Sequence, residues 1–173
     1  MMSQDFMDLY NVNAIKDSGE RRVFDTGSVR DMSAGKGRFD LMPLGEIYLL
    51  SDEFGGIFHY IDQFQKTGEY TPLRNAAEAV VHDLFITPYH AFIELSKHFE
   101  NGLKKYGQDN WKHGIPASSY CDSALRHYCK HKAGYTDEPH AVACLWNLVC
   151  CMWTIENRPE MNVYSKEEKE NAE

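Results

Sequence analysis

The sequence predicts an all-α protein: a helical bundle with a C-terminal antiparallel helix hairpin and an irregular N-terminal arm. Apolar residues recur every three or four positions through residues 88–106, and no segment sustains the alternation typical of strands. The chain has 173 residues, of which 43% are hydrophobic and 13% aromatic, so it can build one buried core. We divide it into an arm at 1–42, a single helical domain at 43–157 and a charged tail at 158–173.

Four helices are expected before the hairpin, each bounded by proline, glycine or capping residues. They cover about residues 43–50, 54–66, 72–85 and 88–106. Thr71-Pro72 and Thr87-Pro88 each combine a hydroxyl N-cap with a proline at the first helical position. Gly107 fits the left-handed C-cap that ends the fourth helix.

Two long helices form the predicted hairpin. They cover about residues 118–133 and 136–157. Ser119-x-x-Asp122 resembles a capping box at the start of the first helix, and Thr136 is the expected cap of the second. Residues 141–155 are apolar nearly all round, so the last helix should be the most buried. A turn of about two or three residues makes the pair antiparallel.

Composition and charge exclude several classes of function. The net charge of −8 opposes a coat for duplex nucleic acid, although a local basic pocket or a divalent metal can still hold a small phosphorylated ligand. No stretch reaches ~18 apolar residues without a charge, so we expect no membrane span. The acidic N-terminus is unlike a secretory signal. Five cysteines without a CxxC pair predict reduced, buried thiols and a cytoplasmic protein.

Polar residues at helical spacing mark the first candidate site, on the helix at 88–106. Glu94, His98, Asn101 and Lys105 share one face, with Glu100 and Lys104 nearby. This stripe is either a metal or phosphate site or a solvated face with ordinary salt bridges.

The hairpin carries the second candidate site. Its first helix presents Asp122, Arg126, His127 and His131, and two histidines at i and i+4 can bind one metal ion. Its second helix places His140 and Asn147 on an apolar surface, where an unsatisfied polar group costs roughly 1–3 kcal/mol. Both therefore need partners, and the facing helix offers Arg126 and His127. The result is either a polar core network or the floor of a ligand pocket.

Two loops add further candidates. Gly35-Lys36-Gly37-Arg38 can bring backbone N–H groups and positive charge to an anion, or form an exposed basic turn. Lys105-Tyr106-Gly107 is followed by Asn110-Trp111, where an indole beside an amide can stack on a base and read its edge. The alternative is that Trp111 only fills the junction between helix and loop.

Several of these residues belong to longer motifs. The motifs are Thr26-Gly27-x-x-Arg30-Asp31, Gly35-Lys36-Gly37-Arg38-Phe39-Asp40-Leu41-Met42-Pro43, His98-Phe99-Glu100-x-Gly102-x-Lys104-Lys105-Tyr106-Gly107-x-x-Asn110-Trp111-x-x-Gly114-Ile115-Pro116, Asp122-Ser123-Ala124-x-Arg126-His127, Asp137-Glu138-x-His140 and Trp146-Asn147. Over residues 25–157 the chain resembles the phage and prophage family of the dATP/dGTP diphosphohydrolase N-terminal domain. Within that span, 45–88 looks like an insertion.

The resemblance implies a purine deoxynucleoside triphosphate as ligand and a bacterial host cytosol as location. Related all-α pyrophosphohydrolases of the MazG-like type hold Mg²⁺ on acidic pairs and cleave a triphosphate to monophosphate and pyrophosphate. This chain has no Glu-x-x-Glu followed by Glu-x-x-Asp on the expected helices. A hydrolase, a non-catalytic nucleotide-sequestering or regulatory protein (for example one that binds a nucleotide defence signal), and a purely structural protein therefore stay open. Fold analogy predicts a homo-oligomer.

The resemblance also assigns roles, residue by residue. Catalytic candidates are Glu100, Asp122 and His127. Ligands for Mg²⁺ or Mn²⁺ are Glu100, Asp122, Asp137 and His140. Nucleotide-binding candidates are Arg30, Lys36, Arg38, Lys104, Lys105, Tyr106, Asn110, Trp111, Arg126, His127 and Asn147. The central expectation is that the basic residues of this nucleotide-binding set lie around one bound anion.

Overall fold

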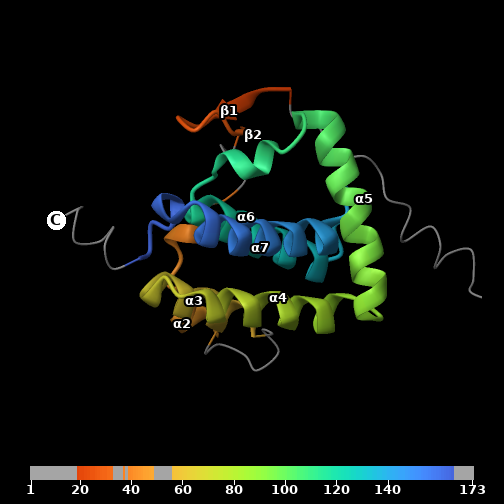
Figure 1. The fold of residues 1–173 in the computed structure, drawn as a ribbon. Coiled ribbons are helices and arrows are strands. Elements are labelled where there is room, and N and C mark those ends of the chain that lie inside the picture. Colours follow the sequence, from red (N-terminus) through yellow and green to blue (C-terminus); the bar gives the residue numbers. More distant parts are fainter. Residues whose placement is uncertain (1–18, 33–36, 38, 49–55, 166–173) are drawn as a thin grey trace, which may run out of the picture.

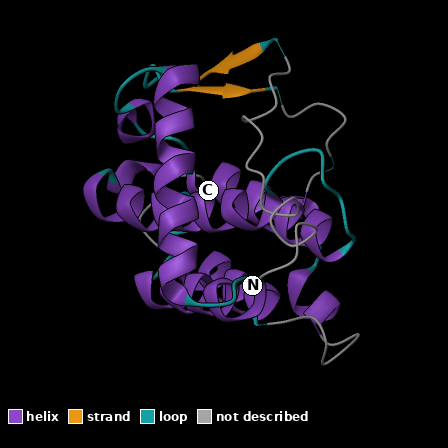
Figure 2. Cartoon of the chain, turned by 90° about the vertical axis from the view of Figure 1, so that its right-hand side faces the viewer, coloured by secondary structure: helices purple, strands orange, loops and turns teal. Residues whose placement is uncertain are grey.

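The computed structural model describes residues 19–32, 37, 39–48 and 56–165, which fold into helices and one small sheet (Figures 1 and 2). The elements are β1 (Arg21–Val23), β2 (Val29–Asp31), η1 (Phe39–Leu41), α2 (Leu44–Tyr48), α3 (Ile57–Thr67), α4 (Tyr70–Leu84), α5 (Pro88–Tyr106), η2 (Asn110–His113), α6 (Ala117–Lys132), α7 (His140–Asn157) and η3 (Pro159–Met161). The all-α fold class is confirmed. Lys36 and Arg38 lie outside the described residues.

Helix α7 is the centre of the molecule, as its apolar sequence predicts. It lies beside α6, with α4 packed below it and α5 crossing its end (Figure 1). Leu145 and Leu148 on α7 are fully buried, together with Leu125 on α6. Within the described residues, no helix combines the length and apolar content needed to span a bilayer.

The capping signals located some helix starts and misplaced others. Thr87 caps α5 as predicted, because its Oγ1 accepts the His90 N–H at 3.2 Å. The Thr71 cap is wrong, because α4 already begins at Tyr70. Pro72 then lies in the first turn, where a missing N–H costs no helical hydrogen bond.

The α6–α7 hairpin forms with a longer connection than the sequence predicts. Helix α7 starts at His140 instead of residue 136, because the residue before Pro139 is disfavoured in helical geometry. Asp137 and Glu138 therefore lie in the connecting segment 133–139 and not in the first helical turn. Ser119 does not cap α6, which begins at Ala117.

The N-terminal arm contains a β-hairpin that the sequence analysis missed, because strands of three residues are too short to show alternation. The side chain of Asn110 holds β2 in place: its Oδ1 accepts the Val29 N–H at 2.9 Å, and its Nδ2 donates to the Val29 carbonyl at 3.0 Å. The antiparallel register sets Arg22 directly opposite Arg30. Figure 2 shows the two strands above the helices.

The segment after α7 packs onto the C-terminal end of α3. Asn162 donates to the carbonyl of Gly68 at 2.8 Å, and the ring of Tyr164 lies 5.3 Å from that of Phe64. Gly68 has a φ of 69°, and a Cβ there would lie 2.7 Å from the Tyr164 carbonyl. This contact needs glycine, so the first part of the predicted tail belongs to the packed structure.

Candidate functional site

A cleft of about 400 Å³ lies between the β1–β2 hairpin and helices α5, α6 and α7. Its volume falls within the range of small-molecule sites. Charged residues in its lining are Arg22, Arg30, Asp31, Asp122, Arg126, Lys130, Asp137 and Glu138. Histidine and aromatic residues in its lining are His98, Tyr106, His127 and Trp146.

Two arginines face each other across the hairpin at one wall of the cleft. Arg22 donates to Ser119 Oγ at 3.1 Å, and Arg30 donates to the Ser119 carbonyl at 3.2 Å. Neither guanidinium has a carboxylate partner among the described residues. Burial lowers the pKa of Arg30, and the charge of Arg22 acts in the same direction. Like charges directly opposite each other destabilise a hairpin, so this pair favours a bound anion.

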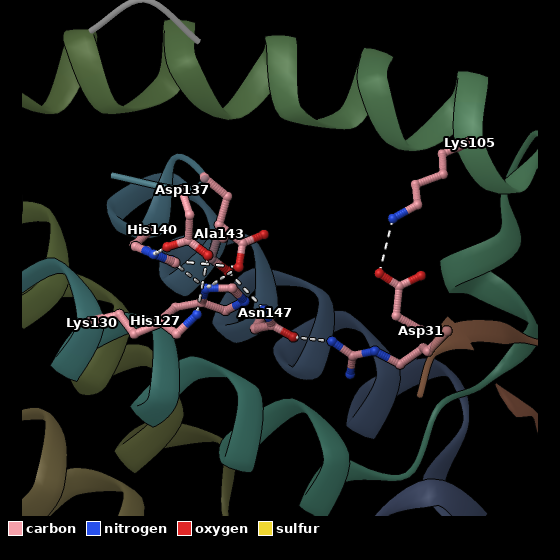
Figure 3. A network of polar contacts seen from close by, with 10 residues as sticks. Asp31, Lys105, His127, Lys130, Asp137, His140, Ala143 and Asn147 are labelled. Atoms are coloured by element: carbon pink, nitrogen blue, oxygen red, sulfur yellow. Dashed lines mark hydrogen bonds and ion pairs between the residues drawn. The ribbon is translucent and has the colours of Figure 1, made fainter. Parts of the chain in front are cut away.

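Asn147 on α7 fixes the position of Arg30. Its Oδ1 accepts from Arg30 Nη2 at 2.6 Å, while its Nδ2 donates to the Ala143 carbonyl at 2.8 Å. Figure 3 shows Asn147 between the hairpin and the histidines of α6 and α7. Asn147 is 2% exposed, so its role here is to orient the arginine.

Arg126 supplies a third guanidinium to the lining, held by an ion pair with Asp122 one turn earlier on α6. Asp122 also accepts the Phe39 N–H at 2.6 Å, which ties η1 to α6. Arg126 reaches the Gly37 carbonyl at 3.4 Å, so the described residue of the glycine-rich loop lies at this wall. Its Nε is buried, and among the described residues it has no hydrogen-bond partner.

A compact group of imidazoles and carboxylates lies near the α6–α7 connection (Figure 3). Its members His127, Asp137 and Glu138 line the cleft, and His140 is buried behind them. The Nδ1 atoms of His127 and His140 are 3.0 Å apart, and Glu138 Oε1 lies 3.6 Å from each. Asp137 Oδ1 lies 2.9 Å from His140 Nε2, and Lys130 lies 3.4 Å from Asp137. Burial, together with the neighbouring His140, lowers the pKa of His127 well below its usual value, so its imidazole is neutral near pH 7.

His98 faces the cleft from α5. It is 6% exposed, and its ring lies 5.8 Å from that of Trp146. Its Nδ1 has no hydrogen-bond partner in the described part of the chain. Burial lowers the pKa of His98 to about 4, and the charge of Lys105 adds to this shift. His98 is therefore a neutral hydrogen-bonding group at physiological pH.

This shift predicts an acid sensitivity that His98→Gln should relieve. The unfolded chain takes up a proton on His98 below pH 6.5, whereas the folded chain does so only near pH 4. The free energy of unfolding should therefore decrease as the pH is lowered from 6.5 to about 4. The contribution of this residue to the decrease is about 3 kcal/mol. Urea unfolding of both proteins between about pH 7 and pH 4 measures the difference.

The matched control is His82→Gln, on the exposed surface of α4. We expect this variant to lose stability on acidification as the wild type does. An acid dependence of His98→Gln equal to that of the wild type contradicts the account of His98.

The cleft gathers only part of the residue set that the sequence nominated. Nominated residues in its lining are Arg30, Tyr106, Asn110, Asp122, Arg126, His127, Asp137 and Asn147. The amide of Asn110 is occupied by Val29, so it is not free to read a base. Tyr106 donates its hydroxyl to Asp31 at 3.1 Å.

Four other nominated residues are placed elsewhere. Glu100 and Lys104 pair with each other at 2.6 Å on the outside of α5, with side chains 62% and 66% exposed. Lys105 pairs with Asp31 at 3.0 Å, as Figure 3 shows. Trp111 packs against Trp153 and Phe99, as in the alternative in which it fills a junction.

The structure does not assemble the four expected metal ligands. Glu100 lies outside the cleft, and Asp122 is committed to Arg126. Among the described residues, the atoms that come together belong to His127, Glu138 and His140, all within 4.8 Å of one another. His127 thus lies beside His140, the partner that the facing helix was expected to offer, and His131 is outside this group.

Two important residues were missed from the sequence. Glu138 stands in the Asp137-Glu138-x-His140 motif, but the expected helix start at Thr136 placed it in a first helical turn, where it had no role as a ligand. No sequence pattern indicated Arg22, because its importance depends on its position opposite Arg30 in a β-hairpin that the sequence did not predict.

A helical domain with opposed arginines and a histidine–carboxylate group in one cleft has the features of a phosphate-handling protein. The chain matches the family model described as dATP/dGTP diphosphohydrolase, N-terminal, over residues 69–163. This range exceeds half of the chain, so the protein belongs to that family, which supports a role related to nucleotide hydrolysis. No curated protein and no solved structure gives a match.

The matched range places the site within the family domain. It spans α4 to η3 and so includes three helical walls of the cleft. Residues 69–88, which the sequence analysis treated as part of an insertion, belong to the match. The hairpin with Arg22 and Arg30 precedes it.

Proposed function

We propose that the cleft binds a purine deoxynucleoside triphosphate and hydrolyses it to the monophosphate and pyrophosphate. The observation that carries this proposal is the Arg22–Arg30 pair, which lacks a carboxylate partner among the described residues and shares its cleft with His127 and Glu138 of the His127–Glu138–His140 group. A polyphosphate chain supplies the negative charge that the pair lacks. The family match supports a nucleotide as the ligand.

The phosphates would bind at the arginine wall. Guanidinium groups make charge-assisted, often bidentate hydrogen bonds to phosphate. Arg22 and Arg30 lie beside the first turn of α6, whose N-terminal dipole also favours an anion. Arg126 adds its unpartnered Nε.

The base would bind among His98, Tyr106 and Trp146, which replace Asn110 and Trp111 in the role that the sequence suggested. Trp146 and Tyr106 offer aromatic surface in the lining of the cleft. His98 offers a buried Nδ1 without a partner to the edge of a purine. A pocket that hydrogen-bonds a base rejects bases that cannot match it.

In the proposed reaction, water attacks the α-phosphorus and the bond from that phosphorus to the bridging oxygen breaks. Pyrophosphate leaves with the bonding electrons, and the proton of the water passes to solvent. A divalent cation, Mg²⁺ or Mn²⁺ in the expectation from the family, would supply charge neutralisation and activation of the water. His127, Glu138 and His140 are the residues whose geometry fits a cation. The arginines hold the leaving pyrophosphate.

Product analysis tests this proposal. The full chain is incubated with dATP or dGTP and either Mg²⁺ or Mn²⁺, and the products are separated by ion-exchange chromatography. We expect monophosphate and pyrophosphate in equal amounts, with dCTP and dTTP hydrolysed more slowly. Release of inorganic phosphate alone, or no turnover with either purine, contradicts hydrolysis.

A non-catalytic nucleotide binder is the second candidate. It is favoured by the partners that the carboxylates of the cleft already have: Asp31 pairs with Lys105, Asp122 with Arg126, and Asp137 with His140. None of these three is free to act as a base. Tight binding of dATP or dGTP without products supports this alternative.

Three further expectations stay proposals. We propose that the protein acts in a bacterial cytosol in a phage context, that it does not bind duplex nucleic acid, and that it forms a homo-oligomer. The apolar helix α7 does not itself require a second subunit, because α4 and α6 pack against it within one chain. Exposed apolar residues of α5, namely Tyr89, Phe92, Ile93 and Leu103, provide a surface for self-association.

A further inference from the structure

We propose that His127, Glu138 and His140 form a binding site for one first-row transition metal ion such as Mn²⁺, Fe²⁺, Co²⁺ or Zn²⁺. This set differs from the ligands that the sequence nominated and from an all-oxygen magnesium site. The role of the ion in hydrolysis rests on the proposed function, whereas its binding can be measured without any nucleotide.

The spacing of the three atoms fits one ion. The Nδ1 atoms are 3.0 Å apart, and Glu138 Oε1 lies 3.6 Å from both. The centre of a triangle with these sides lies about 2.0 Å from each corner, which is the usual length of a bond from zinc to imidazole nitrogen or carboxylate oxygen. The ligand atoms are thus already at coordination distance from a common point.

The protonation pattern also favours a cation. Asp137 Oδ1 accepts from His140 Nε2, which fixes the proton on that nitrogen and leaves a lone pair on His140 Nδ1. Glu138 Oε1 lies 3.6 Å from this nitrogen, and His127 Nδ1 lies 3.0 Å from it and offers a further lone pair in the tautomer that binds metal. Lone pairs that converge repel each other unless a cation or a proton lies between them.

Asp137 completes the arrangement as an orienting residue. Metal-binding histidines commonly donate their other ring nitrogen to a carboxylate, and loss of that carboxylate weakens metal binding. Lys130 in turn lies 3.4 Å from Asp137 and holds it beside His140. The connecting segment therefore supplies one ligand, Glu138, and the partner of another.

The donor set selects the class of metal. Imidazole suits transition ions, whereas Mg²⁺ prefers oxygen ligands and retains most of its water. Two imidazoles and one carboxylate leave further positions open for water or phosphate oxygen, as in catalytic metal sites. Mg²⁺ alone is therefore a poor occupant of this site.

Metal binding is tested on the full chain after treatment with a chelator. The protein is titrated separately with Co²⁺, Mn²⁺, Zn²⁺ and Mg²⁺, and bound metal is measured by mass spectrometry after desalting, with visible absorption as a second readout for Co²⁺. We expect about one equivalent of transition metal and no retained Mg²⁺. Glu138→Gln and His127→Asn should lose this binding, and Asp137→Asn should weaken it by about 10- to 100-fold.

The matched control is His131→Asn, one turn beyond His127 on α6 and outside the group. It should bind metal as the wild type does. Circular dichroism of each variant shows whether it is folded, and Glu138→Gln keeps the shape of a half-buried side chain. Retained binding in Glu138→Gln and His127→Asn, or binding of Mg²⁺ alone, overturns the proposal. Metal binding without nucleotide hydrolysis would instead reject only the proposed function.

Discussion

Arg22→Met should weaken binding of a purine deoxynucleoside triphosphate by about 10- to 100-fold, because a hydrogen bond to a charged group contributes about 1.5–3 kcal/mol. Methionine keeps apolar contact with the ring of Phe24, over which the guanidinium lies at 4.4 Å. The variant should be as stable as the wild type or more stable, because one of two opposed positive charges is gone. Calorimetric titration with the α,β-methylene analogue of dATP measures affinity, and thermal unfolding measures stability.

Arg74→Met is the matched control, because Arg74 is an arginine on the exposed surface of α4. Its side chain is 60% exposed, it pairs with Glu78 at 2.8 Å, and it is not among the cleft residues. Its affinity should stay within about threefold of the wild type. Equal affinities of the two variants contradict a phosphate site at Arg22, and lower stability of Arg22→Met would indicate a structural role.

Asp122→Asn should destabilise the protein by about 3 kcal/mol, because it leaves the buried Arg126 without a counter-charge. The side chains of both residues are 9% exposed, so water cannot replace the lost partner. Asparagine can still accept the Phe39 N–H, so the effect reports mainly on the ion pair. Urea unfolding at pH 7 measures the change.

Glu78→Gln provides the control for this substitution. Glu78 pairs with Arg74 at the same i, i+4 spacing, but the two side chains are 54% and 60% exposed. Such pairs contribute about 0–1 kcal/mol.

Metal content should be unchanged in Asp122→Asn if Asp122 is not a ligand. A stability equal to that of the wild type, or a loss of bound metal, contradicts the structural role given to Asp122.

The helices could be predicted from the sequence because their signals are local. Thr87 and Pro88 mark the start of α5, and the apolar run in α7 marks the central helix. The misplaced start of α7 shows the limit of such signals. Thr136, Asp137 and Glu138 resemble a capped first turn, but the steric effect of Pro139 on the preceding residue prevents the helix from starting there.

The site could be predicted only in part, because its geometry depends on contacts between distant segments. Arg126, His127 and Asn147 were found from their spacing on helices. The pairing of Arg22 with Arg30 depends on the register of a short hairpin, which Asn110 fixes from 81 residues away. Neither strand carries enough residues for a local pattern to show this.

The residues of the proposed metal site could likewise be predicted only in part. The sequence suggested two partners for His127, namely His131 at helical spacing on its own helix and His140 on the facing helix. The observed pairing arises because α6 and α7 pack side by side and bring the two Nδ1 atoms to 3.0 Å. Glu138 joins them only because it precedes the helix.

The most direct test of the central claim is a crystal structure of the protein with the α,β-methylene analogue of dATP. We expect the phosphates within hydrogen-bond distance of Arg22 and Arg30 and the base against His98 and Trp146. A second hollow of about 530 Å³, lined by Glu100 and Trp111 among others, offers a distinct place for a nucleotide. A nucleotide bound there, with no ligand between the two arginines, would contradict the account.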